Sequence, residues 1–193
     1  TKREYALVFI APMDAPGVKL LCRPSYEMAA EVMGSPFDYP LSSRLDENDA
    51  IFVLEDVFIP WDDVFVYADI ETANNFFPQT GFLPRALLHG CTRLAVKLEF
   101  IAGLMMQALE ATGTKDYRGQ QVRLGEVIAY RNLFWSLSDT MARNATPWVN
   151  GAVLPNMEAA TAYHVFGATF YPIVKNLIEQ SITSGLIYLN SSA

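Results

Sequence analysis

The chain has 193 residues and a formal net charge of -7; 51% of its residues are hydrophobic and 18% are charged. This charge disfavours a nucleic-acid partner, because binding a phosphate backbone needs a concentrated positive patch. No apolar run approaches the roughly 20 residues of a membrane-spanning helix, and no signal-peptide pattern opens the chain. Cys22 and Cys91 lie far apart without zinc-ligand spacing. We therefore predict reduced cysteines, no metal site, no membrane contact and a cytoplasmic location.

The first third of the chain predicts antiparallel β structure. Residues 5–11 and 18–23 are rich in β-branched and apolar residues and are separated by turn formers. Residues 50–59, interpreted as a buried strand, and residues 64–67 give two more strands, and residues 24–34 give a short helix. We expect these strands to be part of a barrel or sandwich.

The rest of the chain predicts helices. A short helix over 69–77 begins with Asp69 as its cap. Helical spacing of apolar residues predicts three long helices, at residues 83–112, from near 119 or 124 to 144, and at about 157–189. Gly113 suits the end of the first helix, and Pro172 should kink or interrupt the third. Short connections between long helices indicate an antiparallel bundle.

These elements give an α+β fold class with three parts. Residues 1–68 are predicted to be part of an antiparallel β domain, residues 69–82 a connecting segment, and residues 83–193 part of a helical bundle. The chain begins within a predicted strand without a start methionine and stops directly after an apolar helical run. It is therefore interpreted as an internal piece of a longer polypeptide.

A stripe of basic residues accompanies the apolar face of the first long helix. Arg85, His89, Arg93 and Lys97 recur every four residues and so share one side of a helix. Arginines one turn on either side of His89 disfavour its imidazolium form, and a neutral imidazole can accept a proton or hold an anionic oxygen. The same spacing also fits a solvated charged face with a structural histidine. Spacing alone leaves both interpretations open.

Several long stretches, in one order, resemble the 4-hydroxyphenylacetate 3-monooxygenase family, which shares the acyl-CoA dehydrogenase fold. The stretches that carry the resemblance are 40–47, 55–61, 91–100, 118–119, 124–127, 145–151 and 183–188. Members of this family carry an N-terminal helical domain before this region and further helices after it. The resemblance therefore implies that the N-terminal helical domain is missing from this chain.

The resemblance also implies an activity. Such proteins are oxygenase components that use O2 and reduced FAD, delivered by a separate flavin reductase, to hydroxylate phenols. It implies that His89 acts as the base, that Arg85 and Arg93 bind the phenolic substrate, and that Arg118 contacts the flavin pyrophosphate. The alternative for Arg118 is a simple turn arginine at a helix start. A homotetramer is expected, and this fragment alone should be inactive.

Two positions decide which branch of the family, and so which class of phenol, the chain resembles. The chlorophenol 4-monooxygenase branch has a histidine in this helix, whereas the 4-hydroxyphenylacetate branch has a glutamine there and a tyrosine one turn earlier. Because this chain has His89 and Ala86, the resemblance favours a halogenated or nitro-substituted phenol, hydroxylated with loss of the substituent. The alternatives are 4-hydroxyphenylacetate 3-hydroxylation, a 4-hydroxybutyryl-CoA dehydratase-like enzyme with Cys91 as an iron–sulfur ligand, and a non-catalytic helical oligomerisation module.

Other polar residues predict structural roles. His164 lies among aromatic and apolar residues and is expected to be a hydrogen-bonded core histidine. Arg131 lies within a helix and needs an acidic partner, such as Glu126 or Asp139. The acidic run at 46–49 fits no calcium loop, so we predict a charged turn.

Overall fold

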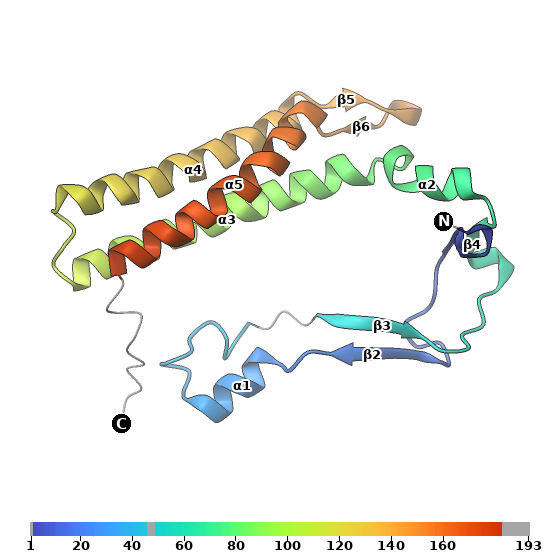
Figure 1. Ribbon diagram of the computed structural model, residues 1–193, viewed down its shortest axis with the longest axis horizontal. Helices are drawn as coiled ribbons and strands as arrows, with labels where there is room; N and C mark the ends of the chain where they lie inside the picture. Colours follow the sequence, from blue (N-terminus) through green and yellow to red (C-terminus); the bar gives the residue numbers. More distant parts are fainter. Residues whose placement is uncertain (1, 46–48, 183–193) are drawn as a thin grey trace. The chain divides into compact units, whose positions relative to one another are not determined.

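A computed structural model describes residues 2–45 and 49–182 of the chain (Figure 1). Short antiparallel strand pairs and long helices make up these residues, so the predicted α+β class is confirmed. They fall into two compact units: a β unit up to Phe76 and a helical unit from Phe77 onward. The three sequence-derived domain boundaries remain predictions.

Two antiparallel strand pairs form the β unit. Strand β1 (Leu7–Phe9) pairs with β4 (Val64–Tyr67), and β2 (Val18–Cys22) pairs with β3 (Ala50–Leu54). All four predicted strands are present, but the third ends five residues early. Asp56 adopts a left-handed conformation with φ 52°, which a continuing strand does not accommodate.

The β unit buries little of its apolar surface. Its short helix α1 (Tyr26–Met33) begins at Ser25, whose hydroxyl accepts a hydrogen bond from the Met28 amide at 3.3 Å. Within the unit, only Ala6, Ala30 and Val66 are buried hydrophobic residues among those described. Four of the five residues of β3 are exposed, so the prediction of a buried strand there is wrong.

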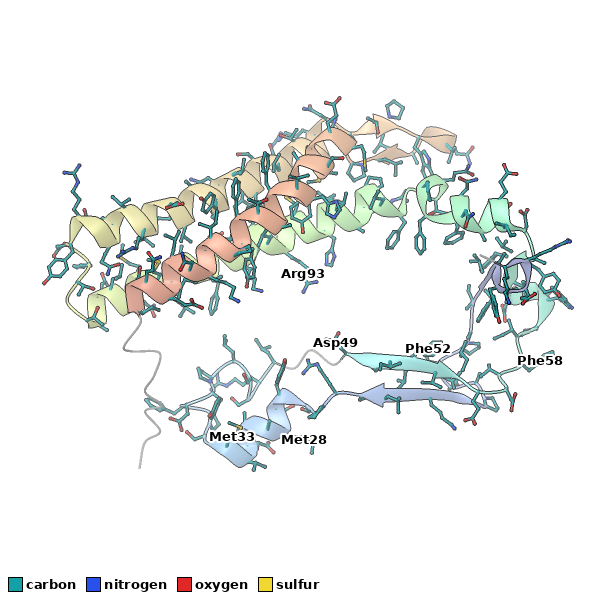
Figure 2. The ribbon with its side chains drawn as sticks, in the orientation of Figure 1. Met28, Met33, Asp49, Phe52, Phe58 and Arg93 are labelled. Atoms are coloured by element: carbon teal, nitrogen blue, oxygen red, sulfur yellow. The ribbon has the colours of Figure 1, made fainter. Side chains whose placement is uncertain are left out.

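Many large apolar side chains of the β unit are exposed, among them Met28, Met33 and Phe58 (Figure 2). Phe37 and Trp61 are exposed as well. An apolar hollow of about 210 Å³ lies beside the β1–β4 pair and the segment that leads into β4. It is lined by Leu7, Phe9, Ile59, Trp61, Val64 and Tyr67.

Helix α2 (Ile70–Gln79) leads into the helical unit. Its start confirms the predicted cap, because the Asp69 carboxylate accepts hydrogen bonds from the Thr72 amide at 3.1 Å and hydroxyl at 2.7 Å. These two bonds lower the pKa of Asp69. Gly81 then turns the chain in a left-handed conformation with φ 68° before α3 begins.

Three long helices, α3 (Phe82–Ala111), α4 (Arg118–Arg143) and α5 (Met157–Ile182), pack against one another (Figure 1). Their shared core consists of Cys91, Ala95, Leu98, Met105, Leu109, Leu124, Val127, Phe134, Met141, Ala159, Ala160, Val174 and Leu177. The predicted apolar faces of the first two long helices are confirmed. Within the described ranges, no helix is both long enough and apolar enough to cross a membrane.

Two details of the helical unit differ from the sequence-based prediction. The expected break after α4 contains a hairpin of two-residue strands, β5 (Thr146–Pro147) and β6 (Val153–Leu154). Helix α5 is continuous through Pro172, so it is not interrupted there, and the alternative of a kink stays a prediction. The last part of the predicted third helix, residues 183–189, lies outside the described residues.

Candidate functional site

The basic stripe lies on the outer side of α3. Arg85, His89, Arg93 and Lys97 are all exposed, whereas Cys91 within the same turns is fully buried. Arg93 projects from α3 on the side away from α4 (Figure 2). The structure therefore places the predicted base and both predicted substrate arginines on consecutive turns of one helix.

Arg85 is engaged by the turn that precedes α3. Its guanidinium donates to the carbonyl oxygens of Thr80 at 3.0 Å and Gly81 at 3.3 Å. It also stacks over the Trp148 ring, 4.8 Å from the ring centroid. Arg85 thus ties the start of α3 to the turn before it and to the β5–β6 hairpin.

The inner side of the His89 turn is fixed to α4. The Cys91 thiol donates to the Phe134 carbonyl at 3.3 Å, and burial raises the pKa of this thiol to about 11. Thr92 donates its hydroxyl hydrogen to the Leu88 carbonyl at 2.9 Å and lies 2.7 Å from the buried Ser138 hydroxyl. Because Thr92 has one hydroxyl hydrogen, Ser138 must be the donor between them. The backbone that carries His89 is therefore anchored from behind.

Helix α5 reaches the same turn through Tyr163. A Cβ atom at Gly90 would lie 2.6 Å from the Tyr163 hydroxyl oxygen, and one at Gly167 would lie 3.1 Å from the Tyr163 ring. The ring also packs edge-on against Phe134, with centroids 6.0 Å apart. Burial raises the pKa of the Tyr163 phenol, and the nearby Cys91 adds to this effect. Tyr163 thus occupies the space that a side chain at position 90 would fill.

Arg118 lies far from His89. It is the first residue of α4, and roughly 33 Å of helix separates His89 from Ala111 at the end of α3. Arg118 is exposed, and the preceding Tyr117 offers no side-chain cap to the helix start. The Gln120 side-chain oxygen is buried there without a hydrogen-bond partner among the residues that the structure describes.

Several predictions about other polar residues need correction. Arg131 pairs with Glu99 of α3 at 2.9 Å, whereas Glu126 accepts from Tyr130 and Asp139 pairs with Arg143. The acidic partner of Arg131 therefore lies on the neighbouring helix α3 and not on α4 itself. His164 is exposed and is not a core histidine. In the acidic run, Asp49 pairs with Arg23 at 3.6 Å, and residues 46–48 lie outside the described residues.

Comparison with known proteins identifies the family. The family described as 4-hydroxyphenylacetate 3-hydroxylase C terminal (HpaB) matches residues 73–193, and its N-terminal counterpart matches residues 1–66. The chain belongs to the 4-hydroxyphenylacetate 3-hydroxylase family. It is 57% identical over 192 residues to a Rhodococcus protein named 4-nitrophenol 2-monooxygenase, oxygenase component. It is also 57% identical over 188 residues to the Pseudomonas aeruginosa 4-hydroxyphenylacetate 3-monooxygenase oxygenase component.

The matches cover nearly all of this chain but a minor part of each HpaB relative. They span 100% and 97% of the chain, and 37% and 36% of those two relatives. A crystal structure of the HpaB oxygenase component complexed with FAD and 4-hydroxyphenylacetate is 29% identical. It aligns with a TM-score of 0.87 over 96% of this chain and 38% of its own. The resemblance to this family, with its fold, is therefore confirmed, and the chain spans little more than a third of the relatives' length.

A more distant likeness concerns the dehydratase alternative. A 4-hydroxybutyryl-CoA dehydratase from N. maritimus aligns with a TM-score of 0.77 at 17% identity, over 92% of this chain and 35% of its own, which shows a shared fold alone. Cys91, the cysteine on which that alternative depended, is fully buried and directs its thiol at the Phe134 carbonyl. The geometry of Cys91 does not support a role as a cluster ligand.

Sequence reasoning found the stripe but missed what lies behind it. Spacing along one helix placed Arg85, His89 and Arg93 on one side. The contacts of Gly90 with Tyr163, and of Thr92 with Ser138, depend on the register between helices, which the periodicity of one helix does not reveal. The only sequence signal was a glycine directly beside His89 within an otherwise strong helix.

Proposed function

We propose that this chain is part of an oxygenase component that uses reduced FAD and O2 to hydroxylate phenols. One observation carries the proposal: within a chain of this family, His89 faces outward between two arginines on a helical turn whose backbone is anchored from behind. A catalytic side chain must be carried by a backbone that is held rigidly in place.

His89 and Arg93 would prepare the phenol for hydroxylation. In the proposed mechanism the imidazole of His89 accepts the phenolic proton, and the resulting phenolate makes the ring electron-rich. The exposed Arg93, one turn along, stabilises the phenolate oxygen. Arg85 belongs to the same substrate-binding set, and its bonds to Thr80 and Gly81 hold the start of the helix. Bound reduced flavin supplies the oxygen-activating chemistry.

The start of α4 is suited to the flavin pyrophosphate. The exposed Arg118 guanidinium matches paired phosphate oxygens, and the first amides of a 26-residue helix without a side-chain cap favour an anion. A Cβ atom at Gly119 would meet no atom within 4 Å, which leaves room for a ligand close to the backbone. The unpartnered Gln120 oxygen would accept a hydrogen bond from a hydroxyl of the cofactor. These residues fit FAD.

The same geometry favours more than one copy in the assembly. Arg118 and His89 are separated by roughly 33 Å of α3, which is longer than the distance from a flavin ring to its pyrophosphate. If both residues serve one flavin, they must come from different copies of the chain. We therefore propose a homo-oligomer, with a tetramer as the expected size. The separate reductase and a cytoplasmic location remain predictions.

The proposed substrate is a nitro-substituted or halogenated phenol. His89 supports this choice, as does the similarity to the protein named for 4-nitrophenol. A further relative from Streptomyces globisporus, 59% identical over 190 residues, is named for a 3-chloro-4-hydroxyphenyl substrate. Loss of the ring substituent remains a prediction. The second candidate, 4-hydroxyphenylacetate, is favoured by the similarity to the P. aeruginosa protein.

The test replaces His89 within the full-length oxygenase that contains this chain, supplied with a flavin reductase. We expect His89→Asn to lower hydroxylation by about 10²–10⁴-fold, because asparagine keeps a hydrogen bond but not the base. Flavin oxidation should continue and release peroxide. Phenols that are already ionised at neutral pH should be less affected than unsubstituted phenol.

The matched control is His164→Asn, since the chain has two histidines and His164 is exposed on α5. This control should leave hydroxylation unchanged. Equal rates in His89→Asn and the parent protein, for every phenol, would remove His89 from the mechanism.

Arg118→Ala tests the flavin assignment. Loss of one charge-assisted contact should weaken reduced-FAD binding by on the order of 1.5–3 kcal/mol, with a smaller effect on turnover of the loaded enzyme. Arg143→Ala serves as the control, because Arg143 is an exposed arginine at the other end of α4 and pairs with Asp139. An unchanged flavin affinity in Arg118→Ala would leave Arg118 as a turn residue.

A further inference from the structure

We infer that Tyr163 of α5 is a positioning residue for His89, acting through its fit over Gly90. This inference rests on the proposed function of His89. The observation is the 2.6 Å that would separate a Cβ atom at Gly90 from the Tyr163 hydroxyl oxygen. Real Cβ atoms are not found so close to another atom, so the Tyr163 side chain can lie over residue 90 in this position only because that residue has no side chain.

Two further neighbours lie against the Tyr163 ring. A Cβ at Gly167 of its own helix would lie 3.1 Å from the ring, and the Phe134 ring of α4 packs edge-on with centroids 6.0 Å apart. A side chain at position 90 must therefore push the tyrosine against these neighbours or move α3 relative to α5. Packed interiors transmit such displacements.

The α3 turn is held at three successive positions. Gly90 contacts Tyr163, Cys91 donates to Phe134, and Thr92 accepts from Ser138. Together these contacts fix the rotation of α3 about its axis at the level of His89. Because His89 is adjacent to Gly90 in the chain, that rotation sets the direction of its imidazole. Tyr163 supplies the contribution of α5, and it does so without touching the substrate.

The experiment uses the two histidines as reporters. Imidazole resonances of the full-length oxygenase that contains this chain are recorded by NMR, and those of His89 and His164 are identified by their loss in His89→Asn and His164→Asn. We expect Gly90→Ala to shift the His89 resonance. Tyr163→Phe removes the clashing oxygen and leaves the closest ring carbon 3.2 Å from the new Cβ atom, so the double variant should move the resonance back toward its parent position. Gly103→Ala on the same helix, where a Cβ meets nothing within 4 Å, should leave His89 unchanged.

Two results would overturn the inference. If Gly90→Ala moves the His164 resonance and leaves His89 in place, α5 yields and α3 does not. If the double variant leaves the His89 resonance where Gly90→Ala put it, the Tyr163 hydroxyl is not the contact that matters. Should Gly90→Ala fail to fold, Tyr163→Leu replaces it: a shifted His89 resonance supports the inference, and an unchanged one refutes it.

Activity gives an independent measurement. In the full-length oxygenase, Gly90→Ala should reduce the yield of hydroxylated product per flavin oxidised by about tenfold to 100-fold, because a small misplacement of a catalytic group is costly. Tyr163→Phe should restore that yield in the double variant. If His89→Asn has no effect on hydroxylation, the proposed function fails, yet the NMR coupling between residues 163, 90 and 89 is still tested by itself.

Discussion

Among the described residues, α3, α4 and α5 bury thirteen hydrophobic residues in one cluster, whereas the β unit buries three. The β unit is nevertheless rich in large apolar residues, including Phe58 with 82% of its surface exposed and Val32 with 88%. An exposed apolar surface of this extent is typical of an interface with other protein. The helical unit therefore contains its own core, while the β unit depends on further contacts for its stability.

The largest expected difference in the free energy of unfolding is between alanine variants of a buried and an exposed phenylalanine. Phe134→Ala should lower the free energy of unfolding by about 3–5 kcal/mol, because Phe134 is fully buried between α3, α4 and α5. Phe58→Ala in the β unit should change it by less than about 0.5 kcal/mol. Urea unfolding followed by circular dichroism measures both. Similar losses for the two variants would contradict the contrast between the units.

The two cysteines give a second comparison, because each unit contains one. Cys22 is exposed at the end of β2, and Cys91 is buried in α3. Burial raises the pKa of Cys91 from an ordinary 9.0 to about 11, so at neutral pH its thiolate fraction should be about 100-fold lower than that of an ordinary cysteine. A thiol reagent should modify Cys22 in the native chain and Cys91 only after unfolding.

The raised pKa of Cys91 also predicts a pH dependence. The protonated thiol is favoured in the folded state, so its contribution to stability is complete below about pH 9 and is lost as the pH rises toward about 11. Cys91→Ser should change this alkaline limb of the stability curve, and Cys22→Ser should not.

In the labelling experiment with the thiol reagent, rapid modification of Cys91 in the native chain would show that the helical core opens more readily than its burial indicates.

The smallest expected effect concerns the pair between Glu99 and Arg131. Arg131, with a smaller contribution from Trp135, lowers the pKa of Glu99. A lowered pKa stabilises the fold above the ordinary value of 4.5, and this contribution is lost as the pH falls through the folded-state pKa. Glu99→Gln should therefore flatten the acid side of the stability curve slightly. Glu31→Gln in the β unit makes the same charge change and is the control.

Helical periodicity carried most of the prediction of the fold. The apolar spacing of α3 and α4 identified both helices, because their buried faces repeat over seven or eight turns, but it left the start of α4 open between residues 119 and 124. The hairpin at β5 and β6 was missed, since two-residue strands beside Pro147 and Gly151 resemble a loop. Strand β3 was predicted too long because the apolar residues after Glu55 continue beyond the turn at Asp56.

The candidate site was predictable where it depends on one helix and not where it depends on two. Spacing placed Arg85, His89 and Arg93 together. The engagement of Arg85 follows from the left-handed turn at Gly81, which directs the Thr80 carbonyl toward the guanidinium. The contact of Tyr163 requires the crossing point of α3 and α5, a property of three-dimensional packing.

Gly81 has a consequence for protein engineering. Its left-handed φ of 68° forms the turn before α3, and a Cβ there would lie 2.7 Å from a Leu154 methyl carbon of β6 and 2.8 Å from the Arg85 guanidinium. The Gly81 turn, Arg85 and the β5–β6 hairpin therefore pack so closely that one of them cannot be changed without the others. A hairpin grafted from a relative into this scaffold will fit only when the turn and the arginine are transplanted with it.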